Sequence, residues 1–208
     1  ATGKTSFCKR SHENVFSDHY RTSVGVDFKL KRLTVNNQKV RLQLWDIMGQ
    51  DRFAGIVRVY YQGTNGVFLV YDVVNDRTFE SILQWKREID MKVRLGDGTP
   101  VPVVLLGNKS DLLDRPKEKV EAEIQEFCKA HGFDGGFLIS CKEGINTDEA
   151  AAFLASRVLE LQKADSMRDG YDPDTTGSAA ISPVPTPATT RPQTLTGSDY
   201  EARNSSCC

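Results

Sequence analysis

The run Val101-Pro-Val-Val-Leu-Leu-Gly107 is almost entirely apolar, and so is the earlier run Gly66-Val-Phe-Leu-Val-Tyr-Asp72. Continuous apolar runs of this length are typical of parallel strands that are buried on both faces of a sheet. Between them, apolar side chains recur at helical spacing over about residues 79–93. A strand, a crossover helix and a second strand predict a parallel sheet covered by helices.

Further elements are predicted on both sides of this unit. In chain order they are a helix over about Thr5–Asn14, strands over Val26–Val35 and Lys39–Asp46 joined by an Asn36-Asn37 hairpin turn, a helix over about Lys117–His131, a strand over Gly136–Cys141 and a helix over about Thr147–Lys163. The alternation of strands and helices indicates an α/β fold, with a mostly parallel sheet and helices on both faces.

The C-terminal segment has a different composition. From about Ala164 onward Ser, Thr, Pro, Gly and Ala dominate, and large aliphatic side chains nearly vanish. Such a segment buries too little apolar surface to offset the entropy of ordering it. We therefore predict one domain over residues 1–163 and a disordered tail over residues 164–208.

Charge and cysteine content exclude some functions. The formal net charge of the 208-residue chain is −1, so no overall basic field recruits nucleic acid, and no nucleic-acid partner is expected. The five cysteines are widely spaced, which favours a reducing compartment over a disulfide framework. No apolar run approaches the roughly 20 residues of a membrane-spanning helix.

A phosphate-binding motif lies at the start of the chain. Gly3-Lys4-Thr5, followed by Ser6 in the first turn of a helix, matches the end of the pattern G-x-x-x-x-G-K-[ST]. Helix N-terminal N–H groups face the phosphates, the Lys4 ammonium neutralises the β and γ groups, and the Thr5 hydroxyl ligates Mg²⁺. A chance Gly-Lys-Thr at a helix start is an equal alternative for these residues alone. The first glycine of the pattern and the strand before it are not in the sequence, so we expect an N-terminally incomplete domain that lacks its first strand.

A second motif follows the strand that ends at Asp46. In Asp46-Ile-Met-Gly-Gln50, the Asp46 carboxylate holds the Mg²⁺ shell through water and the Gly49 N–H approaches a γ-phosphate. Gln50 orients the attacking water and is the predicted catalytic residue. The alternative is an ordinary turn after a strand.

The most discriminating motif is Asn108-Lys-Ser-Asp111, directly after a buried strand. The Asp111 carboxylate accepts hydrogen bonds from the N1–H and 2-amino groups of guanine, a pattern that adenine does not offer. Asn108 ties loops together and the Lys109 stem lies along the base plane. After the next strand, Ser140-Cys141-Lys142 supplies backbone N–H groups and a lysine on the other side of the base. The order of these pieces predicts GTP and GDP as ligands.

With these motifs, residues 1–163 resemble a small GTPase of the Rab family, which implies the P-loop small-GTPase fold. The stretches that carry the resemblance are Val24-Gly-Val-Asp-Phe28, Trp45-Asp-Ile-Met-Gly-Gln-Asp-Arg-Phe53, Tyr60-Tyr-Gln-Gly63 and Leu69-Val-Tyr-Asp72. The subgroup that serves lysosomes and lysosome-related organelles is the most similar, on the basis of Ile47, Lys92-Val-Arg-Leu95 and Gly98-Thr-Pro-Val-Pro102.

The resemblance implies further nucleotide contacts in the segment after the first helix. Phe16 stacks on the base and Tyr20 lies over the phosphates. Ser23 ligates Mg²⁺ from the position where relatives usually carry Thr, with the adjacent Thr22 as a rival.

The resemblance also implies an effector surface. Phe28, Trp45 and Tyr60 match the aromatic trio through which Rab proteins present their nucleotide state to effectors, and plain core packing is the alternative for these side chains.

The last two residues, Cys207 and Cys208, resemble the Rab terminus that carries two geranylgeranyl groups. The resemblance implies effector proteins, an exchange factor, a GTPase-activating protein, and a GDP-dissociation inhibitor or escort protein as partners. It places the chain on the cytoplasmic face of endosomal or lysosome-related membranes, from which it cycles with the cytosol.

We therefore predict a GTP-binding switch with slow intrinsic hydrolysis that regulates vesicle trafficking. Met48 beside the γ-phosphate N–H, and Ser23 in place of Thr, depart from the family pattern. They keep open a nucleotide-dependent effector-binding module with negligible catalysis. A P-loop kinase is disfavoured by Asn108–Asp111, and a truncated product without function is the remaining alternative.

Overall fold

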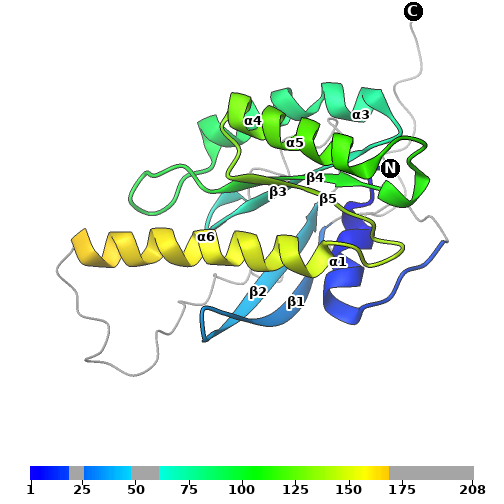
Figure 1. Ribbon diagram of the computed structural model, residues 1–208. Helices are drawn as coiled ribbons and strands as arrows, with labels where there is room; N and C mark the ends of the chain where they lie inside the picture. Colours follow the sequence, from blue (N-terminus) through cyan, green and yellow to red (C-terminus); the bar gives the residue numbers. More distant parts are fainter. Residues whose placement is uncertain (19–25, 48–60, 169–208) are drawn as a thin grey trace, which may run out of the picture. The chain divides into compact units, whose positions relative to one another are not determined.

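The computed structural model describes residues 1–18, 26–47 and 61–168 (Figure 1). Its elements, in chain order, are α1 (Lys4–Glu13), β1 (Val26–Val35), β2 (Gln38–Ile47), β3 (Val67–Asp72), α3 (Asp76–Glu80), α4 (Ile82–Lys92), β4 (Val103–Asn108), the 3-10 turn η2 (Ser110–Leu112), α5 (Lys117–His131), β5 (Gly135–Leu138) and α6 (Thr147–Arg168). The strands form a two-stranded sheet, β1-β2, and a three-stranded sheet, β3-β4-β5.

The three-stranded sheet is parallel and β4 is its middle strand. Val103 and Leu105 of β4 pack into one apolar core with α4 and α5, whereas Val104 and Leu106 pack into another with α1 and α6. Successive side chains of a strand point to opposite faces, so a continuous apolar run is required to fill both cores. In Figure 1, α3, α4 and α5 lie on one face of this sheet, and α1 and α6 lie on the other. The predicted α/β fold class is confirmed.

The hairpin β1-β2 is antiparallel, and Val35 pairs with Gln38 across its two-residue loop. The loop residues Asn36 and Asn37 have φ angles of 48° and 63°. A type I′ turn needs positive φ at both central positions, which asparagine tolerates better than most residues. The predicted Asn36-Asn37 turn is therefore present.

Side chains attach the hairpin to the helices. The Lys31 ammonium, on β1, donates to the Ser11 carbonyl of α1 at 2.9 Å and pairs with Asp148 of α6 at 2.8 Å. Within the described residues no backbone ladder joins this hairpin to β3-β4-β5. Strand pairing stops at β2 on one side and at β3 on the other. The described strands therefore form two sheets, in place of the single sheet expected from the sequence.

The helix expected over about residues 79–93 is divided at Ser81 into α3 and α4. The Ser81 hydroxyl donates to the Arg77 carbonyl four residues earlier at 3.3 Å. Back-bonding of this kind competes with the helical pattern and bends helices. The predicted apolar stripe still holds in α4, where Ile82, Lys86 and Ile89 are buried.

Two predicted ends differ from the structure by more than two residues. The strand expected to reach Cys141 ends at Leu138, because the Ser140 N–H bonds to the Ile145 carbonyl at 3.2 Å instead of continuing the ladder. The last helix continues to Arg168, past the predicted end at Lys163. Between Lys163 and Gly170 the sequence has no glycine or proline that would stop the helix earlier.

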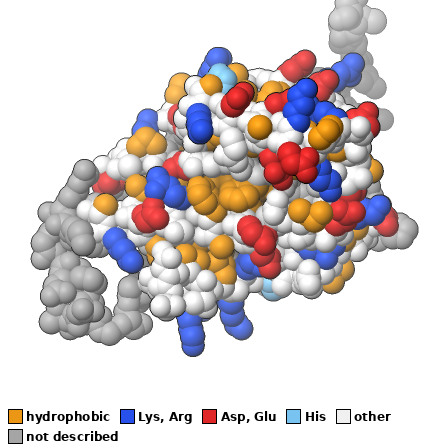
Figure 2. Space-filling view, viewed as in Figure 1, with side chains coloured by type: hydrophobic (Ala, Val, Ile, Leu, Met, Phe, Trp, Pro, Cys, Tyr) orange, Lys and Arg blue, Asp and Glu red, His pale blue; other side chains and the backbone are white. Residues whose placement is uncertain are grey.

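The carboxyl ends of β3 and β4, and the segment after β5, meet at one edge of the parallel sheet, where open α/β folds bind ligands. Asp72 ends β3 and Asn108 ends β4. On the face drawn in Figure 2, acidic and basic side chains are intermixed, in keeping with the net charge of −1. None of the helices in the described ranges is long and apolar enough to cross a bilayer.

Candidate functional site

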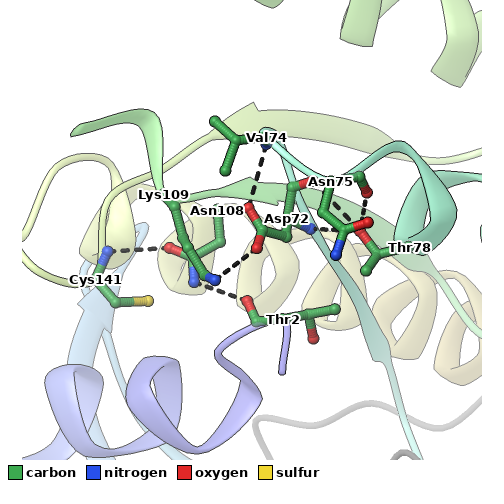
Figure 3. Close-up of polar contacts among 8 residues, drawn as sticks. All are labelled: Thr2, Asp72, Val74, Asn75, Thr78, Asn108, Lys109 and Cys141. Atoms are coloured by element: carbon green, nitrogen blue, oxygen red, sulfur yellow. Dashed lines mark hydrogen bonds and ion pairs between the residues drawn. The ribbon is translucent and has the colours of Figure 1, made fainter. Parts of the chain in front are cut away.

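The Asn108 side chain joins two loops at the carboxyl end of β4 (Figure 3). Its Nδ2 donates to the Thr2 carbonyl at 2.9 Å, and its Oδ1 accepts the Cys141 backbone N–H at 3.1 Å. Asn108 is 2% exposed, so bulk water does not compete for these hydrogen bonds. The predicted phosphate loop and the loop after β5 are therefore held together by one amide group.

Gly3 makes the close approach between these loops possible. Its φ is +95°, and a Cβ atom built on it would lie 2.2 Å from Nδ2 of Asn108. Any side chain at this position would collide with the junction, and the left-handed backbone would strain it further. Glycine is therefore required at position 3 for two reasons, the positive φ angle and the close approach of the Asn108 side chain.

Helix α1 begins directly after Gly3, so Lys4, Thr5 and Ser6 form its first turn. No side chain caps this end and its first turn carries no acidic residue. The first N–H groups of a helix lack intrahelical acceptors and carry a partial positive charge, which suits an anion such as a phosphate. Asn14, in the left-handed conformation, ends the helix.

A pair of oxygen donors lies beside this turn. The Thr5 hydroxyl donates to Oδ2 of Asp46 at 2.6 Å, and Asp46 is 6% exposed near the end of β2. Hydroxyl and carboxylate oxygens are the donors that Mg²⁺ prefers in proteins. Thr5 and Asp46 therefore fit the metal site expected from the sequence.

The Asp111 carboxylate is oriented by the loop after β5. Ser140 Oγ donates to Oδ1 of Asp111 at 2.6 Å and accepts the Glu143 backbone N–H at 3.1 Å. Ser140 is fully buried, and its carbonyl accepts the Gly144 N–H at 2.8 Å. The hydroxyl is thus fixed in a tight turn, and it leaves the second oxygen of Asp111 for another donor.

Lys109 follows Asn108 with a φ of 72°, in the left-handed region that lysine rarely adopts. Its Nζ lies 2.5 Å from Oδ2 of Asp72, at the end of β3 (Figure 3). The Lys109 side chain is 34% exposed, whereas that of Asp72 is 7% exposed. The ammonium therefore lies at the sheet edge, beside a buried counter-ion.

Arg10 of α1 supports the same loop from behind. Its Nε donates to the Cys141 carbonyl at 2.7 Å and its Nη2 to the Lys142 carbonyl at 2.5 Å. Its Nη1 donates to the carbonyl of Asn14 at 2.9 Å. One guanidinium therefore connects the end of α1 to the loop predicted to hold the base.

The thiols near the site are buried and inert. Burial raises the pKa of Cys8 from 9.0 to about 12, with the nearby Asp46 carboxylate as the next cause. Burial also raises the pKa of Cys141 to about 12, against the opposing effect of the Arg10 guanidinium. Neither thiol is ionised at neutral pH, so neither acts as a nucleophile.

Comparison with known proteins decides the family. A sequence profile described as "Ras family" matches residues 1–160. The chain belongs to the Ras family. It is 48% identical over 158 residues to Ras-related protein Rab-32 of Homo sapiens, which covers 76% of this chain and 70% of the relative. It is 42% identical over 193 residues to Ras-related protein Rab-32A of Dictyostelium discoideum, which covers 92% of this chain and 87% of the relative.

A third relative is Ras-related protein Rab-7L1 of Rattus norvegicus, 42% identical over 168 residues, which covers 80% of this chain and 81% of the relative. This Ras-family protein is therefore a Rab-type GTPase, which binds guanine nucleotides and hydrolyses GTP. The resemblance expected from the motifs is confirmed.

Two of the three predicted effector aromatics of this Rab-type chain lie in described strands. Phe28 and Trp45 are cross-strand partners in β1-β2, with ring centroids 5.4 Å apart. Phe28 is 47% exposed and Trp45 is 41% exposed. Plain core packing, the alternative for these side chains, does not describe them.

Other predicted residues are placed or fall outside the described ranges. Phe16, predicted to stack on the base, is half-buried against the core that contains Phe7 and Cys141. The predicted residues outside the described residues are Tyr20, Thr22, Ser23, Met48, Gly49, Gln50, Tyr60, Cys207 and Cys208. Their roles stay predictions.

Two residues at this Rab-type site had no predicted role. Asp72 carried a usable signal, because it is an acidic residue at the carboxyl end of a buried parallel strand, where ligand sites form. No sequence signal marked Arg10 as part of the site, because an arginine on a helix is ordinarily a solvated side chain.

Proposed function

We propose that this Rab-type GTPase is a slow guanine-nucleotide switch that regulates membrane trafficking, in the subgroup that serves lysosome-related organelles. The observation that carries the proposal is the Asn108 junction, because one buried amide holds the Thr2 loop and the Cys141 loop together. A nucleotide needs its phosphates and its base held at a fixed separation, and this junction supports that spacing.

Asp111 selects the base in this proposal. With Oδ1 occupied by Ser140, the carboxylate is held in one orientation toward the N1–H and 2-amino groups of guanine. GTP should displace bound fluorescent GDP at low concentration, and ATP should not. Equal competition by ATP would overturn the proposal.

A second test exchanges hydrogen-bond donor and acceptor between residue 111 and the base. Asp111→Asn replaces a carboxylate oxygen by an amide donor, so it should weaken GTP binding and favour xanthosine triphosphate, whose base carries an oxygen in place of the 2-amino group. Unchanged preference for GTP would remove Asp111 from base recognition.

Lys4, Thr5 and Asp46 hold the phosphate end in this proposal. Lys4 and the N–H groups of α1 neutralise phosphate charge, and Thr5 with Asp46 (through water) would hold Mg²⁺ together with Ser23. Bound Mg²⁺ supplies charge neutralisation to the phosphates. Thr5→Ala should speed GDP dissociation, and chelation by EDTA should then add little. A full EDTA effect in Thr5→Ala would count against the Thr5 ligand.

Hydrolysis relies on Gln50, which orients the attacking water. No arginine is assigned to the charge of the transition state, so intrinsic turnover is slow and an activating protein raises it by roughly 10³–10⁵. Single-turnover measurement of Gln50→Leu should show hydrolysis lost while GTP binding is kept. Rapid turnover by the unmodified protein alone would contradict the slow switch, whereas no turnover even with an activator would favour the effector-binding module.

The conformational output depends on the γ-phosphate, which orders two switch segments, Phe16–Phe28 and Ile47–Tyr60, and whose loss releases them. Phe28 and Trp45, with Tyr60, form the surface that effectors contact, and an exchange factor and a GDP-dissociation inhibitor or escort protein complete the cycle. Replacing Phe28 by Ala should abolish GTP-dependent effector capture without changing nucleotide affinity. Lost nucleotide affinity would instead indicate a structural role.

Membrane attachment uses Cys207 and Cys208, each carrying a geranylgeranyl group. Two lipids are needed because one chain gives only marginal, reversible binding, and the segment after α6, residues 169–208, has few basic residues to assist it. The protein then resides on the cytoplasmic face of endosomal or lysosome-related membranes and cycles with the cytosol. Mass spectrometry of protein from eukaryotic cells should show both modifications, and unmodified cysteines would refute them.

A further inference from the structure

Asp72 is the last residue of β3 and lies within the sheet edge, 5% exposed. It is separated from Lys109 by 37 positions in the sequence, yet its Oδ2 lies 2.5 Å from Nζ of that lysine. A carboxylate at this depth is stable only when it is paired and hydrogen-bonded. Lys109 supplies the pairing.

The two oxygens of Asp72 have separate partners. Oδ1 accepts the Val74 backbone N–H at 3.2 Å, whereas Oδ2 takes the Lys109 ammonium. The Asp72 backbone N–H donates to Thr78 Oγ1 at 2.9 Å, and that hydroxyl donates to the Asn75 carbonyl at 2.8 Å. The turn after β3 therefore fixes the carboxylate independently of Lys109 (Figure 3).

Lys109 is constrained at its other end as well. Its backbone is left-handed, and its neighbours Asn108 and Ser110 are anchored, since the Ser110 N–H donates to the Ile139 carbonyl at 3.1 Å. A lysine has four rotatable side-chain bonds, and a free one would sweep a wide volume at the sheet edge. Fixing the ammonium at Asp72 confines the aliphatic stem to the path between them.

We propose that Asp72 is a positioning residue that holds the Lys109 stem in place along the guanine plane. The proposal rests on the proposed function, in which Lys109 contacts the base. Asp72 itself touches no ligand and acts through the lysine. It acts on the base end of the nucleotide, so it affects GDP and GTP alike.

A purely architectural ion pair is the competing explanation, since Asp72 and Asn108 end neighbouring strands and the Val73 N–H already bonds to the Asn108 carbonyl at 3.0 Å. If the role of Asp72 is architectural, replacing Asp72 should still change the nucleotide dissociation rate in a protein whose residue 109 carries no charge. A positioning role would disappear with the lysine, because nothing would remain to position.

The test measures dissociation of fluorescent GDP and GTP from the full chain, in Mg²⁺. Asp72→Asn keeps an oxygen for the Val74 N–H and replaces the charged oxygen that faces Lys109 by an uncharged amide donor. We expect dissociation of both nucleotides to become about tenfold faster, the effect of losing one charge-assisted hydrogen bond. Asp76→Asn, at an exposed position in the first turn of α3, is the matched control and should leave the rates unchanged.

The decisive comparison is the double variant. Lys109→Met keeps most of the stem and removes the ammonium, so it should also speed dissociation. Asp72→Asn combined with Lys109→Met should be no faster than Lys109→Met alone. Rates that multiply, or an unchanged rate in Asp72→Asn, would overturn the proposal. Slower dissociation in Asp72→Asn would also overturn it, since Asp72 would then compete with the nucleotide for Lys109.

A second variant covers loss of folding. If circular dichroism shows that Asp72→Asn is unfolded, Asp72→Glu replaces it, because it keeps the charge but displaces the ammonium by one methylene. Asp72→Glu should give a smaller increase in the dissociation rate. Combined with Lys109→Met, it should give no further increase over Lys109→Met alone. Failure of the unmodified chain to bind GDP would sink the proposed function itself. If the unmodified chain binds GDP normally, and Lys109→Met speeds nucleotide dissociation but the Asp72 variant does not, only the positioning role is wrong.

Discussion

Ser140 Oγ lies 2.6 Å from Oδ1 of Asp111, although 29 positions separate the two residues in the sequence. The hydroxyl belongs to the loop after β5, and the carboxylate belongs to η2 after β4. The orientation of the proposed base-selecting group is therefore set by an uncharged hydroxyl of a neighbouring loop.

Ser140→Ala should weaken base selection, because it frees the Asp111 carboxylate and leaves the Glu143 N–H without its acceptor. A hydrogen bond to a charged group contributes about 1.5–3 kcal/mol, so GDP dissociation should become roughly ten times faster or more. Stopped-flow fluorescence measures the rate. Ser156→Ala, on the surface of α6, should leave it unchanged, and an equal effect of both variants would contradict this role.

Gly3→Ala should destabilise the protein and weaken nucleotide binding together. The new Cβ would stand 2.2 Å from Asn108 Nδ2, so the amide must shift and release the Thr2 carbonyl. Gly98→Ala is the matched control, because Gly98 also has positive φ but a Cβ atom added there would meet no heavy atom within 4 Å. It should cost about 1–2 kcal/mol from backbone strain alone.

Thermal unfolding and GDP titration of both glycine variants separate strain from collision. Gly3→Ala should lose more unfolding free energy than Gly98→Ala, and only Gly3→Ala should lose affinity for GDP. Equal losses in the two variants would show that Asn108 gives way without cost.

Arg10→Met should speed dissociation of GDP and GTP by similar factors, since the guanidinium binds the Cys141 and Lys142 carbonyls behind the proposed base site. Arg10→Lys should be intermediate, because an ammonium reaches fewer of these acceptors at once. Lys9→Met, an exposed neighbour on α1, serves as the control for lost charge. An Arg10→Met protein with unchanged rates but a lower melting temperature would assign Arg10 to stability alone.

Stability should fall at alkaline pH in a way that depends on Cys8. Its folded pKa, raised by burial to about 12, lies above the ordinary value of 9.0. The unfolded chain therefore releases the thiol proton first, so this contribution is fully present below pH 9 and is lost between pH 9 and 12. The slope reaches at most about 1.4 kcal/mol per pH unit.

Urea unfolding across that window measures the effect of Cys8. The unmodified protein should lose more unfolding free energy between pH 8.5 and pH 10.5, roughly the onset of this linkage, than Cys8→Ala does. Cys141 and Tyr71, whose pKa values burial also raises, are present in both proteins, so the difference between the two curves reports the Cys8 thiol together with its coupling to Cys141. Parallel curves for the two proteins would show that Cys8 is not shielded as described.

Local rules were enough for most of the fold. The apolar run over Val103–Leu106 implied burial on both faces because side chains alternate along a strand, and Asn36-Asn37 implied the hairpin turn because both residues accept positive φ. Ser81, by contrast, divided a predicted helix through a hydroxyl back-bond, which periodicity alone does not reveal.

The order of motifs along the chain determined the family and the residue types of the site. It could not determine their pairing: Thr5 with Asp46, Lys109 with Asp72, and Arg10 with the Cys141 carbonyl join positions that lie 41, 37 and 131 residues apart. Periodicity and propensity describe neighbours in sequence. These contacts form only when α1 packs against β2 and against the loop after β5, and when the parallel strands β3 and β4 bring their carboxyl ends to one edge. The tertiary structure alone therefore decided which side chain holds which.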